Sequence, residues 1–274
     1  MITIIYGGVG MGKTCFLAHT LNRFAFDKER NTLMRREIES LNSIGFNLTV
    51  PKHCVSANFP LEFRKFGYTR RNSRLINPFH LGFKNEDVKT HFNFPYEVIG
   101  ITEAQTYFNS RMSLYYPDWQ SRFFEEHRHN NLDFYLDCQR SHLIDLNIRE
   151  LSTFIEIVRL DIKNNEFGSP CKLTWTLRII ENNFLNEKYL NSGKTDKSCY
   201  TEQKVVADYN VFSLYDSQLM KPKFYDGRYF KDFDYKQSCI TERSLDGFKE
   251  FCKSIDGAVP QGFYKKRTAK TDKN

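Results

Sequence analysis

The sequence predicts an α/β fold in which a mainly parallel β-sheet lies between two layers of helices. Three observations lead to this expectation. Short apolar runs typical of buried strands recur at residues 1–6, 54–58, 96–101 and 133–138. Apolar residues at helical spacing follow the first run over 15–26. Strands that alternate with helices favour a parallel sheet, because parallel neighbours need crossover connections.

The remaining elements fit this pattern. Further helices or helical turns are expected at about 30–42, 117–130 and 142–151. Residues 153–160 and 172–180 are rich in β-branched side chains and flank turn residues at Asn164, Asn165 and Gly168. We therefore predict that these two segments form an antiparallel pair at the edge of the sheet.

The expected domain organisation is one folded core with an extension. The core covers residues 1–190, and within it 62–95 is predicted to be an inserted loop or hairpin, because it is rich in Arg, Asn, Phe and Pro. Residues 191–264 show no clear period and are expected to form an irregular C-terminal extension. Lys, Arg and Thr dominate residues 265–274, which predicts a basic disordered tail.

The composition narrows the class of protein. Seven scattered cysteines without a C-x-x-C pair disfavour a disulfide framework or a zinc ribbon and favour a reducing compartment. No window holds about 18 continuous apolar residues, so no membrane span is expected. The first residues read as a strand and not as a secretory signal. A formal charge of +7 suits a nucleic acid or an anionic membrane surface as partner, and equally an ordinary basic protein.

Residues 7–14, Gly-Gly-Val-Gly-Met-Gly-Lys-Thr, match the pattern G-x-x-x-x-G-K-[ST] between a predicted strand and a predicted helix. Backbone N–H groups of such a loop point at phosphate oxygens, and the helix N-terminus adds partial positive charge. Lys13 is expected to bridge the β- and γ-phosphates, and the Thr14 hydroxyl to coordinate Mg²⁺. The predicted contacts to ATP come from Gly7, Gly8, Val9, Gly10, Met11, Gly12, Lys13, Thr14 and Cys15.

Two predicted strand ends carry side chains that suit ATP hydrolysis. Glu103 is predicted to act as general base on the attacking water, with a solvated strand-end Glu as the alternative. Gln139 is predicted to contact the γ-phosphate or that water, with a hydrogen-bonded core residue as the alternative. Thr102 stands where most ATP-hydrolysing proteins with such a loop have Asp. It is therefore expected to hold Mg²⁺ only through a coordinated water.

The element His127-Arg128-His129 is interpreted as a source of positive charge and not as a metal site. Histidines two positions apart point to different faces of a helix, and no third ligand is near in the sequence. Arg128 is predicted to be an arginine finger that supplies charge to a neighbouring subunit's γ-phosphate, with a plain surface arginine as the alternative.

Several stretches together resemble the zonular occludens toxin-like family, which includes the assembly and export ATPases of filamentous phages. They are the phosphate loop, VSANFPL (55–61), ITEAQTYFNSR (101–111), EEHRHNNLDFYLDCQ (125–139), DLNIREL (145–151) and FSLYDSQ (212–218). The resemblance covers about residues 1–218. It implies an additional-strand, FtsK/HerA-like P-loop NTPase fold, a homo-oligomeric ring, and a motor that extrudes single-stranded phage DNA through the host inner membrane during virion assembly.

The resemblance also implies residue roles. Lys13 and Thr14 match the nucleotide-binding loop of the family and Glu103 the acidic residue of its second nucleotide motif. Gln139 matches the sensor at the next strand end, and Arg128 the arginine of the HRH element, with Arg149 as the runner-up for the finger.

Two departures from the family pattern set further expectations. Thr102 replaces the usual Asp, which predicts a slow or partner-stimulated ATPase. The membrane span that typically follows the YDS element is missing. The protein is therefore expected in the host cytoplasm, and at the inner membrane only through a separate membrane partner protein.

Two other functions stay open. A nucleotide-binding assembly or scaffold protein would change its oligomeric state with little hydrolysis, and Thr102 favours it. A small-molecule kinase would need a lid and an acceptor pocket, which the segment 62–95 could supply. Within that segment Arg70, Arg71 and Arg74 are the best local candidates for contact with DNA phosphates, against the alternative of a solvated loop.

Overall fold

The computed structural model describes residues 1–45, 48–65, 69–76, 78, 81, 84–85, 90–91, 93–111 and 118–215 of the 274-residue chain. The expected C-terminal extension beyond Tyr215 and the basic tail at 265–274 lie outside this part.

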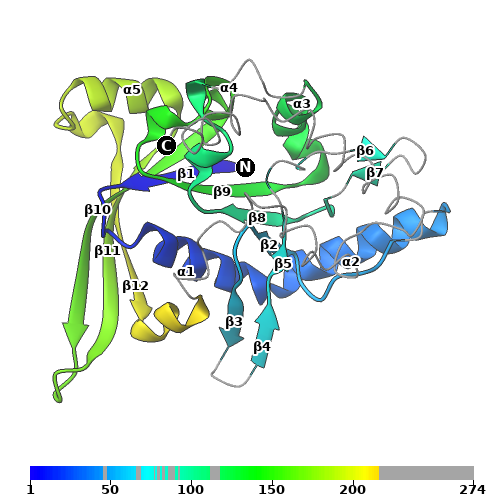
Figure 1. Ribbon diagram of the computed structural model, residues 1–274, viewed down its shortest axis with the longest axis horizontal. Helices are drawn as coiled ribbons and strands as arrows, with labels where there is room; N and C mark the ends of the chain where they lie inside the picture. The colour runs from blue at the N-terminus through cyan, green and yellow to red at the C-terminus, as the bar shows by residue number, and fades with distance from the viewer. Residues whose placement is uncertain are drawn as a thin grey trace, which may run out of the picture.

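A central sheet of eight strands has the order β12-β11-β10-β1-β9-β8-β2-β5 (Figure 1). Its strands are β1 (Ile2–Gly7), β2 (Val55–Ala57), β5 (Arg74–Leu75), β8 (Val98–Ile101), β9 (Asp133–Cys138), β10 (Ser152–Asn164), β11 (Pro170–Ile180) and β12 (Thr201–Asp208). Neighbouring strands from β10 to β5 are parallel, whereas β11 and β12 pair antiparallel. One strand, β9, lies between the phosphate-loop strand β1 and the strand β8 that leads to Glu103. The predicted fold class and the antiparallel pairing of the two segments are confirmed, but a further strand, β12, forms the edge beside them.

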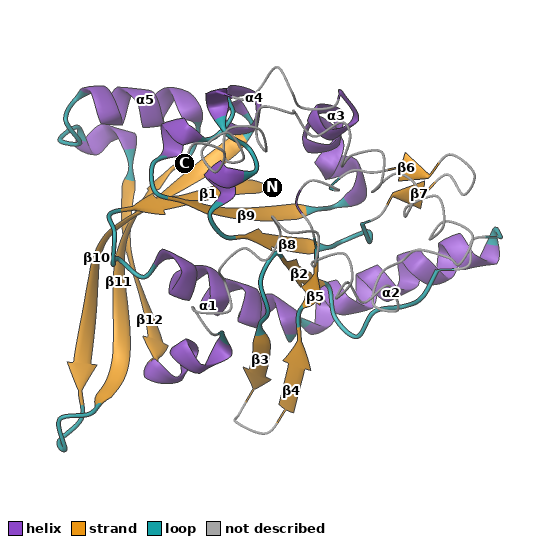
Figure 2. Ribbon diagram, viewed as in Figure 1, coloured by secondary structure: helices purple, strands orange, loops and turns teal. Residues whose placement is uncertain are grey.

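Helices cover both faces of the sheet (Figure 2). On one face lie α1 (Lys13–Ala25) and α2 (Lys28–Ser43), and on the other α3 (Asp118–Glu126), α4 (Leu146–Glu150) and α5 (Asn183–Asn191). The apolar core is split accordingly, and the alternation along β1 shows the division. Ile5 belongs to the cluster that includes α1 and α2, whereas Ile2, Ile4 and Tyr6 belong to the cluster on the opposite face.

Close packing of α1 on β8 fixes where the phosphate loop lies. A Cβ atom added to Gly100 would approach Leu21 Cδ1 to 2.3 Å, so only glycine lets this helix lie so near the strand. Leu21 is completely buried. The N-terminal end of α1 is thereby held beside the carboxyl ends of β1, β9 and β8.

The predicted insertion at 62–95 contains two small antiparallel pairs. They are β3 (Glu62–Lys65) with β4 (Thr69–Asn72), and β6 (Lys84–Asn85) with β7 (Thr90–His91). Between them, β5 returns to the central sheet and pairs with β2. The segment is therefore part hairpin and part sheet edge.

The folded core continues beyond the expected boundary at residue 190, which falls inside α5. β12 pairs along its whole length with β11, and the 3₁₀ segment η7 (Tyr209–Leu214) packs against α1. The sequence did not indicate β12, because six of its eight residues are exposed and the strand lacks apolar alternation. The short polar helix α5 was missed for a similar reason.

Within the described residues, no helix is both long enough and apolar enough to cross a membrane. The five cysteines of that part, Cys15, Cys54, Cys138, Cys171 and Cys199, are free thiols.

A buried histidine ties β2 to the β3–β4 hairpin and makes stability depend on pH. The ring of His53 is 7% exposed, accepts the N–H of Val55 at Nδ1 (3.2 Å) and contacts the Asn72 carbonyl oxygen through Nε2 (2.9 Å). Burial lowers its pKa from 6.5 to about 4, and the charges of Arg71 and Arg74 act in the same direction.

Because the unfolded chain takes up this proton first, we expect stability to fall as the pH drops from about 6.5 to about 4. The loss at the lower limit is about 3 kcal/mol from this residue. Denaturant unfolding across this range should show a flatter pH slope for His53→Gln than for the wild type. His129→Gln, at an exposed position, is the control. Equal slopes in His53→Gln and wild type would contradict the assignment.

Candidate functional site

The glycine-rich loop connects the end of β1 to the start of α1, as predicted. Gly12 is the residue before the helix and has a φ of 70°, in the left-handed region that favours glycine. A Cβ atom at Gly12 would also lie 3.0 Å from Leu160 Cδ2 and 3.2 Å from Trp175 Nε1. At Gly7 a Cβ atom would approach the Ile157 carbonyl oxygen to 2.7 Å. The loop is thus pressed against β10 and β11.

The side chains of the loop take different positions. Lys13 Nζ donates to the carbonyl oxygens of Gly7 (3.2 Å) and Gly8 (3.1 Å), so the amine lies over its own loop. Val9 is 87% exposed at the tip. Cys15 is buried in the core, and burial raises the pKa of its thiol to about 12. Of Cys15, therefore, only the backbone N–H suits a ligand.

Three strand-end and helix-start residues meet beside this loop. The Asp137 carboxylate oxygen Oδ2 accepts hydrogen bonds from the hydroxyls of Thr14 (3.0 Å) and Thr102 (2.9 Å). The two hydroxyl oxygens are 3.4 Å apart. The register explains the meeting, because Asp137 pairs with Ile5 of β1, and its neighbour Leu136 pairs with Ile101 of β8.

Asp137 is completely buried, and burial raises the pKa of its carboxyl to about 6. Its hydrogen bonds with the N–H of Glu103 and with the hydroxyls of Thr102 and Thr14 act in the opposite direction and limit the rise. The oxygen atoms of Thr14, Thr102 and Asp137 are hard donors, the kind that Mg²⁺ prefers. The cluster thus fits Mg²⁺ beside a phosphate loop.

Glu103 follows directly in the chain. Its backbone N–H donates to Asp137 Oδ1 (3.1 Å), and its side chain is exposed. Its φ of 51° and ψ of 42° place a non-glycine residue in the left-handed region, a conformation that costs energy and clusters at functional sites. The carboxylate accepts a hydrogen bond from the amide of Gln105.

The remaining predicted strand-end residue, Gln139, directly follows β9 and is exposed. It belongs to the same edge of the sheet as Gly7 and Thr102, because β1, β9 and β8 are parallel neighbours. The structure therefore brings the loop, Thr102, Glu103 and the end of β9 together.

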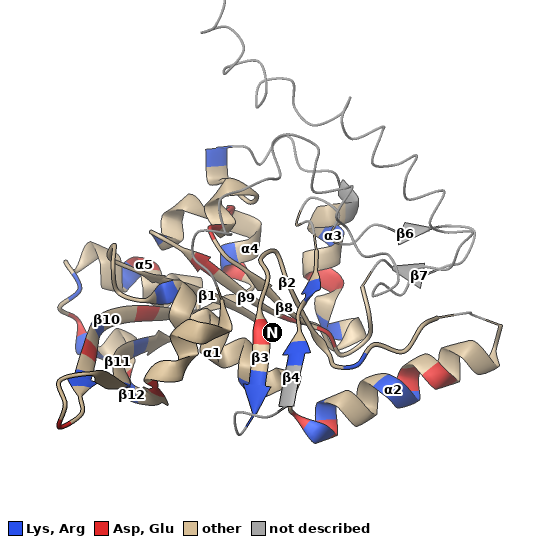
Figure 3. Ribbon diagram, turned by 60° about the horizontal axis from the view of Figure 1, so that its bottom comes forward, with Lys and Arg blue, Asp and Glu red and all other residues tan. Residues whose placement is uncertain are grey.

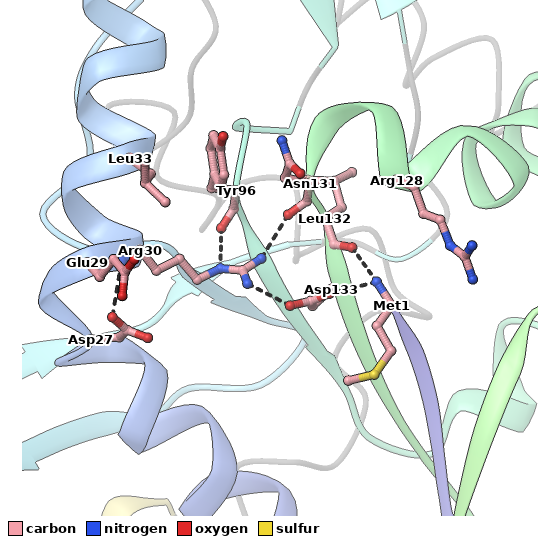
Figure 4. A pocket seen from close by; sticks show the side chains of 10 residues that line it. All are labelled: Met1, Asp27, Glu29, Arg30, Leu33, Tyr96, Arg128, Asn131, Leu132 and Asp133. Carbon is pink, nitrogen blue, oxygen red and sulfur yellow. Dashed lines mark hydrogen bonds and ion pairs between the residues drawn. The ribbon is translucent and has the colours of Figure 1, made fainter. Parts of the chain in front are cut away.

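Arg128 lies elsewhere in the same chain. It lines an open cleft of about 320 Å³ near Met1 and Asp133, at the amino ends of β1 and β9, which is the edge opposite the phosphate loop. Arg30 lines the same cleft and donates hydrogen bonds to the Asp133 carboxylate (2.6 Å) and to the Tyr96 carbonyl oxygen (2.7 Å). In Figure 4 the guanidinium group of Arg128 turns away from Arg30. Because Arg128 is exposed at the edge opposite the phosphate loop, it does not contact the loop of its own chain.

Arg149, the runner-up for the finger, is held within its own chain. Its Nε donates to the Ile144 carbonyl oxygen (3.1 Å), and Nη1 lies 3.4 Å from Glu187 Oε1 on α5. The two histidines that flank Arg128 differ in burial. His127 is buried against Phe134, and His129 is exposed.

The arginine cluster of the insertion is not a uniform basic surface. Arg74 is buried and forms an ion pair with Glu97, the residue directly before β8. Arg71 donates to the Ala25 carbonyl oxygen (2.7 Å) and stacks over Phe26. The side chain of Arg70 lies outside the described part. Figure 3 shows Lys and Arg along β3 and β4, but the expectation that Arg74 contacts DNA is wrong for this fold, because its charge is used inside the protein.

Sequence reasoning missed two residues of the site, Asp137 and Asn58. Asn58 follows β2 and clamps Thr102, since it accepts the Thr102 N–H (2.8 Å) and donates to its carbonyl oxygen (3.0 Å). An available signal for Asp137 was a carboxylate inside the otherwise apolar run Phe-Tyr-Leu-Asp-Cys, one position before the strand ends.

No protein-family model and no curated protein matches the chain. Among solved structures it is similar to the N-terminal domain of zonular occludens toxin from Neisseria meningitidis, with 19% identity, coverage of 78% of this chain and 98% of that chain, and a TM-score of 0.44. The genome packaging NTPase of Sulfolobus turreted icosahedral virus 2 in complex with ATP-gammaS has 10% identity, coverage of 74% and 95%, and a TM-score of 0.33. TM-scores this low assign no roles to individual residues, which rest on the contacts within this chain alone.

Proposed function

We propose that the chain binds ATP with Mg²⁺ at the phosphate loop and hydrolyses it to ADP and phosphate. The observation that carries this proposal is the meeting of Thr14, Thr102 and Asp137 beside the loop, with Glu103 next in the chain. A glycine-rich turn with a purely structural role has no need of a buried carboxylate joined to the first turn of its helix.

Each residue has a proposed task. Loop N–H groups and Lys13 hold the phosphates, and the Lys13 amine leaves the carbonyl oxygens of Gly7 and Gly8 to do so. Mg²⁺, when bound, neutralises the charge that develops on the phosphate oxygens. Glu103 accepts the proton of the attacking water, and Gln139 orients that water or the γ-phosphate.

The proposed biological task is a slow or partner-stimulated motor that moves phage DNA during virion assembly. It is supported by the six ordered stretches that resemble the zonular occludens toxin-like family and by the net charge of +7. In this proposal the chain forms a homo-oligomeric ring in the host cytoplasm and acts on single-stranded DNA. Arg128 serves the neighbouring subunit, and a separate protein provides contact with the inner membrane.

A second candidate, a nucleotide-binding scaffold with little hydrolysis, is favoured by one specific observation. Thr102 offers a hydroxyl where an acid would normally follow β8. Such a scaffold would bind ATP and change oligomeric size, but it would turn over no faster in the presence of DNA.

Tryptophan fluorescence gives a direct test of binding. Trp175 is buried on β11, close to Gly12 and packed on Phe16, and the chain has one other tryptophan, Trp119. In a Trp119→Phe variant, a non-hydrolysable ATP analogue should change the emission of Trp175 in a saturable manner. ATP turnover of the same protein, measured with and without single-stranded DNA at low salt, then separates the two candidates.

The outcomes are distinct. Saturable binding with turnover that rises with DNA supports the motor. Saturable binding with a DNA-independent, near-zero rate and a nucleotide-dependent oligomer size supports the scaffold. The absence of any saturable change, with the analogue and with ATP alike, would contradict nucleotide binding itself.

A further inference from the structure

The chain contains four buried acidic side chains among its described residues, and three of them have an evident partner. Glu97 pairs with Arg74, and Glu156 pairs with Lys194 and Arg178. Asp145 is the N-cap of α4 and accepts the N–H of Asn147 (3.0 Å). Such partners offset the large cost of burying a negative charge.

Asp137 is the fourth, and it has neither kind of partner. Within the described part of the chain, it forms no ion pair with a cationic side chain and caps no helix. Two hydroxyls and one backbone N–H are its only hydrogen-bond donors there. A carboxylate placed in this way has no cationic partner among the described residues, and it lies against Thr14 in the first turn of the helix that follows the phosphate loop.

We infer that Asp137 carries the carboxylate of the Mg²⁺ site, one strand away from the position after β8 where Thr102 stands. This inference rests on the proposed nucleotide binding. It goes beyond that proposal, because it moves the metal's acidic partner from β8 to β9.

The chemistry of the neighbours fits this role. Mg²⁺ keeps several waters and is typically held through one or two carboxylates together with substrate phosphates. The Thr14 hydroxyl donates its hydrogen to Asp137, which leaves the lone pairs of its oxygen for a cation. Thr102 donates to the same carboxylate oxygen and thereby helps to hold it in place.

In this chain a hydroxyl stands after β8, where most ATP-hydrolysing proteins with such a loop have Asp, and a carboxylate stands on β9 beside it. Thr102 directly follows β8, Asp137 lies on the neighbouring strand β9, and the two side chains contact each other directly, at 2.9 Å. A hydroxyl on β8 with a carboxylate on β9 therefore places the same two groups in nearly the same space as the reverse arrangement. The deficit predicted from Thr102 alone is compensated within the fold.

The test compares affinity for a non-hydrolysable ATP analogue with Mg²⁺ and with EDTA, read from Trp175 emission in full-length Trp119→Phe protein. We expect Asp137→Asn to lower the Mg²⁺-dependent gain in affinity about 10- to 100-fold and to leave the affinity in EDTA unchanged. The amide keeps the size of the side chain and can still accept the Glu103 N–H. Restoring a carboxylate with Thr102→Asp in the Asp137→Asn background should regain part of the gain.

Asp133→Asn is the matched control, because it makes the same change on the same strand at the opposite edge of the sheet. It should keep the full Mg²⁺ gain. Equal losses with Mg²⁺ and EDTA in Asp137→Asn, or no regain in the double variant, would assign Asp137 to holding the strand ends and overturn the inference. If the Trp119→Phe protein with Thr102 and Asp137 unchanged binds the analogue, and Asp137→Asn keeps the Mg²⁺-dependent gain in affinity, this inference fails alone. If that parent protein binds no analogue, the proposed function fails as well.

Discussion

Lys13→Ala is expected to lower ATP turnover about 10²- to 10³-fold, the usual effect of removing one preorganised charged donor from a transition state. Lys13 is the first residue of α1, and its amine already lies over the loop through the carbonyl oxygens of Gly7 and Gly8. A small movement therefore brings the charge onto a phosphate, with little ordering cost at the moment of binding. Steady-state phosphate release at saturating ATP measures the effect.

Lys28→Ala is a suitable comparison, because Lys28 is the exposed first residue of α2 and lies away from the loop. It should retain full turnover. Wild-type turnover in Lys13→Ala would show that the phosphates bind elsewhere. Loss of turnover in both variants would point to a general effect of reduced positive charge and not to the loop.

The loop could be predicted from sequence because its signal is contiguous. Strand, glycines, Lys13 and the helix start follow one another within residues 1–26, and each needs only local geometry to take its place. The same holds for the strands at 96–101 and 133–138, whose apolar runs are buried on both faces. Such segments can be predicted from their own residues, without knowledge of which strands or helices lie beside them.

The Asp137 cluster required the register between strands. Asp137 and Thr14 are 123 positions apart, and only the pairing of β9 with both β1 and β8 brings Asp137 to Thr14 and Thr102. A residue-by-residue comparison with a family assigns the missing acid to the position of Thr102 and stops there. The carboxylate that we infer to compensate for Thr102 lies on the neighbouring strand β9, outside that linear motif.

The run of arginines in the insertion is the opposite case, because the sequence suggests a continuous basic surface that the fold does not form. Arg70, Arg71 and Arg74 read as one basic patch when they are written in a line. In the structure Arg71 belongs to the hairpin strand β4, whereas Arg74 starts β5 and enters the sheet. Burial of Arg74 against Glu97 could not be inferred from composition, since it depends on a partner 23 positions away.

Arg74→Met is expected to lower the free energy of unfolding by about 3–5 kcal/mol, the usual effect of leaving a buried charge without its partner. Arg74 donates through Nε to Ser56 (2.8 Å) and lies over the ring of Phe94, and Glu97 is completely buried. Methionine keeps the aliphatic stem, so the change removes mainly the charge. Denaturant unfolding followed by circular dichroism measures it.

Glu97→Gln in the Arg74→Met background should recover more than about 1 kcal/mol, because it removes the stranded charge. The amide keeps an acceptor for the Phe94 N–H, which lies 3.2 Å from Glu97 Oε2. If instead Arg74→Met leaves stability unchanged and weakens DNA binding, the arginine acts at a surface and the ion pair contributes little. Because the double variant restores stability without restoring the guanidinium, DNA binding by that variant separates a structural from a phosphate-binding role. Recovery of both together assigns Arg74 to the fold alone.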